Sequence, residues 1–372
     1  MEWKELRSSF PVTGKWAFFD HAAVAPISGP ARQAMIEWAD DLAQNGDVNE
    51  RRWLARIEEV RRLFGQLLHT EPQNIAFVKN TTEGIGFVAQ GYPWRPGDNV
   101  ITAAEEYPSN IYPWLNLASR GVEVRRIESR YNRIEVDDIR QAADDRTRLV
   151  SLSFVEFASG FRNNLDQIGE WCRSRGIHFF VDAIQGLGVL PLDVSRTPID
   201  FLAADGHKWL LGPEGAGIFY IRPELLDLLH PVGVGWNSVV GARDFSKIDF
   251  HLKPHAGRWE GGSLNVAGIT ALGGSLELLL RIGTDAIARR LKELTDLICE
   301  EARRRGHTVF SSRQENEWSG IVSLIPKDGE PRAIVKRCFE KNFVINHRAG
   351  RLRLSPHCYN TTDEIVALFE IL

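Results

Sequence analysis

The sequence predicts an α/β protein with a mainly parallel sheet sandwiched by helices, followed by a smaller α+β unit. Through the first two thirds of its 372 residues, short apolar segments alternate with helix-like ones. Strands that are apolar throughout are typical of a sheet buried on both faces. From residue 269 the order changes to two long helices and then to mixed strands and helices, which indicates a second unit.

Seven apolar segments are the strand candidates of the first unit. They are residues 74–78, 99–104, 122–127, 148–155, 177–183, 199–205 and 218–221. Helices fit between most of them: residues 49–68 carry apolar side chains on one helical face, and residues 164–176 end at a glycine.

The second unit is expected to begin near residues 250–270. Its elements are long helices at 269–283 and 284–306, a strand at 319–325, a helix at 330–342, a strand pair at 343–346 and 351–355, and a last helix at 361–372. We expect a large domain at residues 16–260 and a small one at 261–372, with residues 1–15 packing against the small domain.

Composition excludes several classes of protein. Charged residues make up 25%, apolar ones 43%, and the formal net charge is −4, so we expect no nucleic-acid partner. No run of 18 apolar residues predicts a membrane span, and the N-terminus lacks the apolar core of a secretory signal. The four cysteines lie far apart, which fits a reduced, cytoplasmic setting and gives no metal-ligand spacing.

Lys208 is the first candidate for chemistry. It lies in "GHKWLLGPEG" (206–215), between the apolar segment 199–205 and the strand-like 218–221. An ammonium group between two buried strands is costly to keep unless it has a use. The alternative is an ordinary basic residue beside a glycine-rich turn.

Asp182 ends another apolar segment, so we expect it at the carboxyl edge of a parallel sheet, where ligands bind in open α/β folds. Lys208 would face the same edge. A lysine and a carboxylate at one crevice suit pyridoxal phosphate, because the lysine can form a Schiff base and the aspartate can keep the pyridine nitrogen protonated. Taken alone, Asp182 is equally well explained as a turn or helix-capping residue.

Three weaker signals accompany this pair. Thr81 and Thr82 stand where a strand meets a helix, and hydroxyls at a helix N-terminus can bind phosphate, although a plain capping box explains them too. Arg353 on a C-terminal strand could bind a carboxylate in a bidentate manner, or be a surface residue. His207 either contacts a phosphate or supports the turn around Lys208.

Two other motifs are weaker competitors. The segment "GLGVLP" (186–191) lacks the third glycine of a dinucleotide-binding turn. His251 and His255 are separated by Pro254 and are not expected to share a helical face as metal ligands, so no metal site is predicted.

Taken together, these residues resemble the aminotransferase class V family of fold-type I pyridoxal-phosphate enzymes. The family includes cysteine desulfurases, selenocysteine lyases, kynureninases and isopenicillin-N-epimerase-like proteins. The resemblance rests on seven segments in order: "FFDHAAVAP", "FVKNTTEGI", "EEYPSNIYPW", "VDAIQGLGVLPLDV", "DGHKWLLGPEGAGIFYI", "RWEGGSLN" and "LRLSPHCYNT". They span nearly the whole chain and imply the fold-type I architecture.

The resemblance implies roles around the cofactor ring. Lys208 would form the Schiff base, Asp182 would contact the pyridine nitrogen, and Gln185 would approach the phenolic oxygen. Tyr107 stands where desulfurases stack a histidine, so stacking is kept but the acid–base option of an imidazole is lost. Phe157 stands where desulfurases have an asparagine, which leaves more of that role to Gln185.

At the phosphate end the resemblance implies contacts from Thr81, Thr82 and His207. Ser263 would reach the phosphate of a neighbouring subunit, which implies a homodimer with active sites at the interface. Many relatives carry a serine or threonine where this chain has Asp205. Because an anion would repel a phosphate, we expect the carboxylate of Asp205 to point elsewhere.

At the substrate end, Arg353 would bind the α-carboxylate of an amino-acid-like substrate, with Arg348 as a second arm. Desulfurases carry a sulfur-accepting cysteine before this arginine, whereas "HRAGRLRLS" (347–355) contains none. Cys358 lies beyond Arg353 and is expected to pack in the following turn. The segment therefore resembles the isopenicillin-N-epimerase-like branch more closely than a desulfurase.

The main hypothesis is an enzyme that acts on an amino acid or related amine after the substrate amine displaces Lys208 from pyridoxal phosphate. Amino transfer and epimerisation are the expected outcomes, and elimination uses the same residues. The alternative is a cysteine desulfurase- or selenocysteine lyase-like C–S or C–Se lyase that forms no protein persulfide. A more distant alternative is a non-catalytic protein that binds the cofactor.

Overall fold

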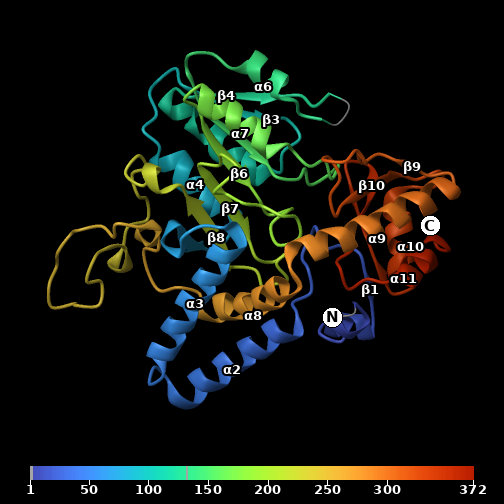
Figure 1. Cartoon of the computed structure of the whole chain (residues 1–372), viewed down its shortest axis with the longest axis horizontal. Helices are drawn as coiled ribbons and strands as arrows, with labels where there is room; N and C mark the ends of the chain where they lie inside the picture. The colour runs from blue at the N-terminus through green and yellow to red at the C-terminus, as the bar shows by residue number, and fades with distance from the viewer. Residues whose placement is uncertain (1–2, 131–132) are drawn as a thin grey trace.

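A computed structural model describes residues 3–130 and 133–372 and is built around a seven-stranded sheet (Figure 1). The strand order is β2-β8-β7-β6-β5-β3-β4. The strands are β2 (Ile75–Val78), β3 (Asn99–Ala103), β4 (Glu123–Ile127), β5 (Thr147–Ser153), β6 (His178–Asp182), β7 (Phe201–Asp205) and β8 (Gly217–Ile221). Strands β7, β6, β5, β3 and β4 run parallel, and β8 is antiparallel to both of its neighbours. The predicted α/β fold with a mainly parallel sheet is confirmed.

Helices cover both faces of this sheet, as the apolar strands predict. They are α2 (Gly29–Asn45), α3 (Glu50–Leu68), α4 (Thr81–Gly91), α5 (Tyr112–Leu115), α6 (Val136–Ala142), α7 (Leu165–Ser174) and α8 (Val266–Ile282). In β6, Phe179 packs in the core cluster that contains residues of α3, α7 and α8, whereas Phe180 packs in the cluster that contains α4 and α5. Successive residues of one strand therefore anchor opposite helical layers.

The C-terminal unit contains a second, antiparallel sheet in the order β12-β13-β10-β9. Its elements are α9 (Thr284–Arg304), β9 (Thr308–Val309), β10 (Val322–Ile325), α10 (Pro331–Phe339), β11 (Phe343–Val344), β12 (Asn346–Arg348), β13 (Arg351–Leu354) and α11 (Thr362–Phe369). The expected strand at 343–346 is split. Strand β11 pairs in parallel with β1 (Ala17–Phe18), and only β12 forms the hairpin with β13.

The N-terminal segment joins the two units. Arg7 of α1 (Trp3–Arg7) pairs with Glu364 of α11 at 2.6 Å, and Phe10 stacks on Tyr359. Helix α8 packs closely against α2 and α3 rather than against the second sheet. The division into residues 16–260 and 261–372 stays a prediction.

None of the described helices could by itself cross a bilayer. Helices α8 and α9 taken together would be long and apolar enough, but a bend of 82° separates them.

Candidate active site

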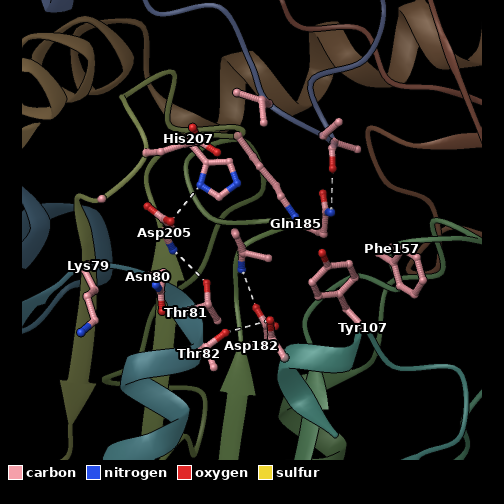
Figure 2. Close-up of a pocket in the computed structure, with 18 of the residues that line it drawn as sticks. Lys79, Asn80, Thr81, Thr82, Tyr107, Phe157, Asp182, Gln185, Asp205 and His207 are labelled. Carbon is pink, nitrogen blue, oxygen red and sulfur yellow. Dashed lines mark hydrogen bonds and ion pairs between the residues drawn. The ribbon is translucent and has the colours of Figure 1, made fainter. Parts of the chain in front are cut away.

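A pocket of about 570 Å³ opens at the carboxyl ends of β6 and β7, beside the start of α4 (Figure 2). Nine of the predicted site residues line it: Thr81, Thr82, Tyr107, Asp182, Gln185, His207, Lys208, Arg348 and Arg353. Most of these side chains meet here because the parallel strands of the main sheet finish at the same edge, whereas Arg348 and Arg353 come from the β12–β13 hairpin of the second sheet.

Lys208 and Asp182 are the buried charged pair at the centre of the pocket. Their exposed fractions are 8% and 2%. Burial lowers the pKa of Lys208 to about 8, although the nearby Asp182 carboxylate opposes the shift. Burial also raises the pKa of Asp182 to about 6, and this shift is opposed by the hydrogen bond that the Ile184 N–H donates at 3.0 Å. A substantial fraction of Lys208 is therefore a neutral amine near pH 8, as a nucleophilic lysine requires.

Aromatic rings form the wall opposite this pair. The Lys208 Nζ lies 5.4 Å from the centre of the Tyr107 ring, and the Tyr107 and Phe157 rings meet edge to face at 5.3 Å. Gln185 is held from both ends, because its amide donates to the Ala22 carbonyl and accepts from the Trp209 indole. Gln185, which would approach the cofactor ring, is therefore fixed by its own partners.

The end of the pocket where the sequence predicts phosphate contacts is built on the start of α4 and the end of β7. The Asp205 N–H donates to the Thr81 hydroxyl at 3.1 Å, which joins the two elements. Thr82 donates to Ser109 at 2.9 Å. We expected Asp205 to point away from this region; instead it lines the pocket, with a carboxylate oxygen 2.9 Å from Nδ1 of His207 (Figure 2).

Two further buried carboxylates lie behind Asp182, and the sequence reasoning missed them. Glu106 accepts hydrogen bonds at 2.5 Å from both the N–H and the hydroxyl of Ser153. Burial raises the pKa of Glu106 and raises that of Glu156 to about 8, so both carboxyl groups take up protons more readily than exposed ones. Their positions just after β3 and β5 could have indicated that they lie near Asp182, because those strands end at the same edge as β6.

The two arginines stand at the other end of the pocket. Arg353 is almost completely buried and pairs with Asp20 at 3.1 Å, and it also donates to the Phe157 carbonyl at 3.0 Å. Arg348 donates to the side chain of Asn346 at 2.7 Å. The sequence reasoning missed Asp20 and Asn346, although Asp20 lies within the quoted segment "FFDHAAVAP".

Ser263 and the cysteines lie away from this pocket. Ser263 lines a separate hollow with Trp38, Leu42 and Trp236, so within this chain it does not face Lys208. All four cysteines are free and buried: Cys172, Cys299, Cys338 and Cys358. Burial raises the pKa of Cys358 to about 12, which makes it a poor nucleophile near neutral pH.

The fold and the site together define a fold-type I enzyme, and its cofactor is pyridoxal phosphate. The residues present fit this group, because a buried lysine with a lowered pKa faces a buried carboxylate beside an exposed aromatic ring and a helix N-terminus.

The chain belongs to the aminotransferase class-V family, whose model matches residues 17–368. A cysteine desulfurase from Cronobacter sakazakii is 30% identical over 97% of this chain and 95% of its own length. An uncharacterized aminotransferase from Schizosaccharomyces pombe is 29% identical over 94% of this chain and 89% of its own. The crystal structure of the cysteine desulfurase CsdA from Escherichia coli covers 100% of this chain and 97% of its own with a TM-score of 0.89 at 26% identity.

Proposed function

We propose that this enzyme cleaves the C–S or C–Se bond of a cysteine-like amino acid and releases the sulfur or selenium directly. The observation that carries the proposal is the buried pair of Lys208 and Asp182 in a pocket that also holds two arginines. The similarity to cysteine desulfurases over nearly the whole chain supports this bond as the target. For cysteine, the expected products are sulfide, pyruvate and ammonium, with one water consumed.

Lys208, Asp182 and Arg353 each have a part in this proposal. When bound, pyridoxal phosphate supplies an electron sink for the substrate α-carbon. The neutral amine of Lys208 would remove the proton from that carbon, and the ionised Asp182 would hold the pyridine nitrogen protonated. Arg353 would fix the substrate by its carboxylate, so that the α-proton faces Lys208.

A persulfide on the protein is not part of the proposal. The described part of the pocket lining contains no cysteine, and the short segment between Arg348 and Arg353 carries none. Mass spectrometry during turnover is therefore expected to find no cysteine that has gained a sulfur atom. Cys358→Ala should keep sulfide release, and a loss of release in a folded variant would identify Cys358 as the sulfur carrier.

Amino transfer or epimerisation is the second candidate. It is favoured by Tyr107, which cannot supply the acid–base group that a histidine would, and by the similarity to a relative called an aminotransferase. Transfer would convert the cofactor to its amine form and yield a keto acid, whereas epimerisation would give the other enantiomer with no change in composition.

One panel of amino acids separates these reactions. Purified holoenzyme is incubated with cysteine, cystine, selenocysteine, alanine and glutamate, and the visible absorbance of the cofactor is followed with analysis of all products. Sulfide or selenide release supports the proposal. A keto acid with the amine form of the cofactor, or an inverted amino acid, supports the second candidate. A protein whose absorbance no amino acid changes would contradict both and favour a non-catalytic role.

We also propose a cytoplasmic homodimer. The loop between β8 and α8 extends from the body (Figure 1) and exposes large apolar side chains, with Phe245, Ile248 and Phe250 at 73%, 99% and 69% exposure. A second copy of the chain could cover them and bring Ser263 to the neighbouring phosphate site. Light scattering should give twice the chain mass, and Ile248→Asp should lower it; a monomer of wild-type protein would contradict the proposal.

A further inference from the structure

We propose that Asp20 and Asn346 are positioning residues that link Arg353 and Arg348 into a single clamp for one substrate carboxylate. The inference rests on the proposed function, in which the substrate is an amino acid. It adds two residues that the resemblance does not assign.

A continuous chain of contacts joins the two arginines. Arg353 Nη2 donates to Asp20 Oδ1 at 3.1 Å, and Asn346 Nδ2 donates to Asp20 Oδ2 at 2.6 Å. The opposite end of the same amide accepts from Arg348 Nη1 at 2.7 Å. Asn346 therefore donates to Asp20, which holds Arg353, and accepts from Arg348. This link fixes the direction of both guanidinium groups.

The backbone holds this chain in place. Asn346 stands directly opposite Arg353 in the antiparallel pair of β12 and β13, where cross-strand side chains are close neighbours. An isolated β-bridge between Asp20 and Ser355, the residue directly after β13, places Asp20 beside this hairpin. The carboxylate thus comes from a segment 333 residues away from Arg353 in sequence.

Both arginines keep donors for a ligand. A guanidinium has five N–H groups, and Arg353 uses one on Asp20 and one on the Phe157 carbonyl. Its Nε is buried and finds no hydrogen-bond partner in the described part of the chain. Arg348 uses its Nη1 on the Asn346 side chain and the His347 carbonyl, and both arginine side chains line the pocket that contains Lys208.

The charges of the clamp match one carboxylate. Asp20 is 6% exposed, and its negative charge offsets one of the two guanidinium charges beside it. Burial raises the pKa of Asp20, but Arg353, Asn346 and Arg348 all oppose this shift and favour the ionised form. One positive charge is left over for a ligand, which suits an amino acid with a single carboxylate at this end of the pocket.

The test compares a ligand with a carboxylate and one without. Asn346→Ala removes both ends of the link, and Asn346→Leu does so while nearly keeping the side-chain volume. The control is Asn116→Ala, which truncates an exposed asparagine outside the pocket lining. Binding of L-cysteine and of cysteamine, which lacks the carboxylate, is measured from the absorbance change of each holoenzyme, and melting temperature and cofactor content are checked.

We expect both Asn346 variants to bind L-cysteine about tenfold more weakly, since hydrogen bonds to charged groups contribute this much, while cysteamine binding stays the same. The control should match the wild type for both ligands. Unchanged L-cysteine binding in a folded variant overturns the proposal, as does an equal loss for both ligands. If L-cysteine binds in this pattern but no sulfide appears, the clamp stands and the proposed bond cleavage fails.

Discussion

The two ends of the pocket are built in different ways. At the cofactor end, Asp182, Asp205 and Lys208 stand on or just after neighbouring strands of one sheet, and Thr81 starts the helix beside them. At the carboxylate end, Asp20 and Arg353 come from opposite ends of the chain and meet through the pairing of β1 with β11 and the bridge between Asp20 and Ser355. The first end depends on one sheet, whereas the second depends on how separate units are joined.

The two ends are therefore expected to have different roles. The cofactor end rests on strands buried on both faces, so its geometry is rigid before any substrate arrives. The carboxylate end lies on a short hairpin and an N-terminal segment, which makes it the place where substrate preference can vary without loss of the cofactor. If the two ends are independent, substitutions at one end should leave the function of the other end intact.

The largest effect is expected from Lys208→Ala. Loss of the base and of the covalent link should lower kcat/KM by about 10⁴-fold, because a positioned acid–base group alone contributes 10²- to 10⁴-fold. Borohydride reduction followed by peptide mass analysis should place the cofactor on Lys208 in the wild type. The exposed Lys341→Ala should leave both results unchanged, and labelling at another lysine would contradict the assignment.

Asp182→Asn should lower kcat by about 10²- to 10³-fold, as expected when a preorganised charge is removed from a buried site. Its pH dependence gives a second test. Because burial raises the pKa of Asp182 to about 6, protonation below that pH removes the charge that the pyridine nitrogen needs. The affinity of cofactor-free protein for pyridoxal phosphate should therefore fall as the pH drops through about 6.

The asparagine variant supplies the control for this pH effect. In Asp182→Asn the position cannot ionise, so affinity should be low and change less between pH 7 and 5. A variant that keeps the full pH dependence of the wild type would assign the effect to another group, such as the cofactor phosphate itself.

Arg353→Lys should affect the other end alone. A lysine cannot make the bidentate contact, so KM for an amino acid should rise about 10- to 100-fold while affinity for pyridoxal phosphate stays unchanged. Steady-state kinetics and a cofactor titration measure the two quantities in one preparation. A parallel loss of cofactor affinity would show that the two ends are not independent.

Asp205→Ser should have the smallest effect. Because the carboxylate lies 2.9 Å from Nδ1 of His207, we expect this neighbour to hold it in place and cofactor affinity to change by less than about tenfold, or ~1.4 kcal/mol. Pyridoxal, which lacks the phosphate, is the matched ligand and should show no change. A large gain in affinity specific to pyridoxal phosphate would mean that Asp205 repels the phosphate.

The main sheet, the edge at which Lys208 and Asp182 meet, and the cofactor were all predicted from the sequence. This was possible because strand ends follow directly from where apolar segments stop, and parallel strands finish at one edge. The same reasoning could have found Glu106 and Glu156, which also follow apolar strands. It did not, because no nearby motif set these two residues apart from ordinary polar residues after a strand.

The pairing of side chains across the pocket could not be predicted from the sequence and became visible in the folded chain. The orientation of Asp205 toward His207, the split of the 343–346 segment between two sheets, and the link from Asp20 through Asn346 to both arginines depend on contacts between distant segments. The local sequence pattern does not predict such contacts, because hydrophobic periodicity gives the face on which a residue lies but not the residue that it contacts there.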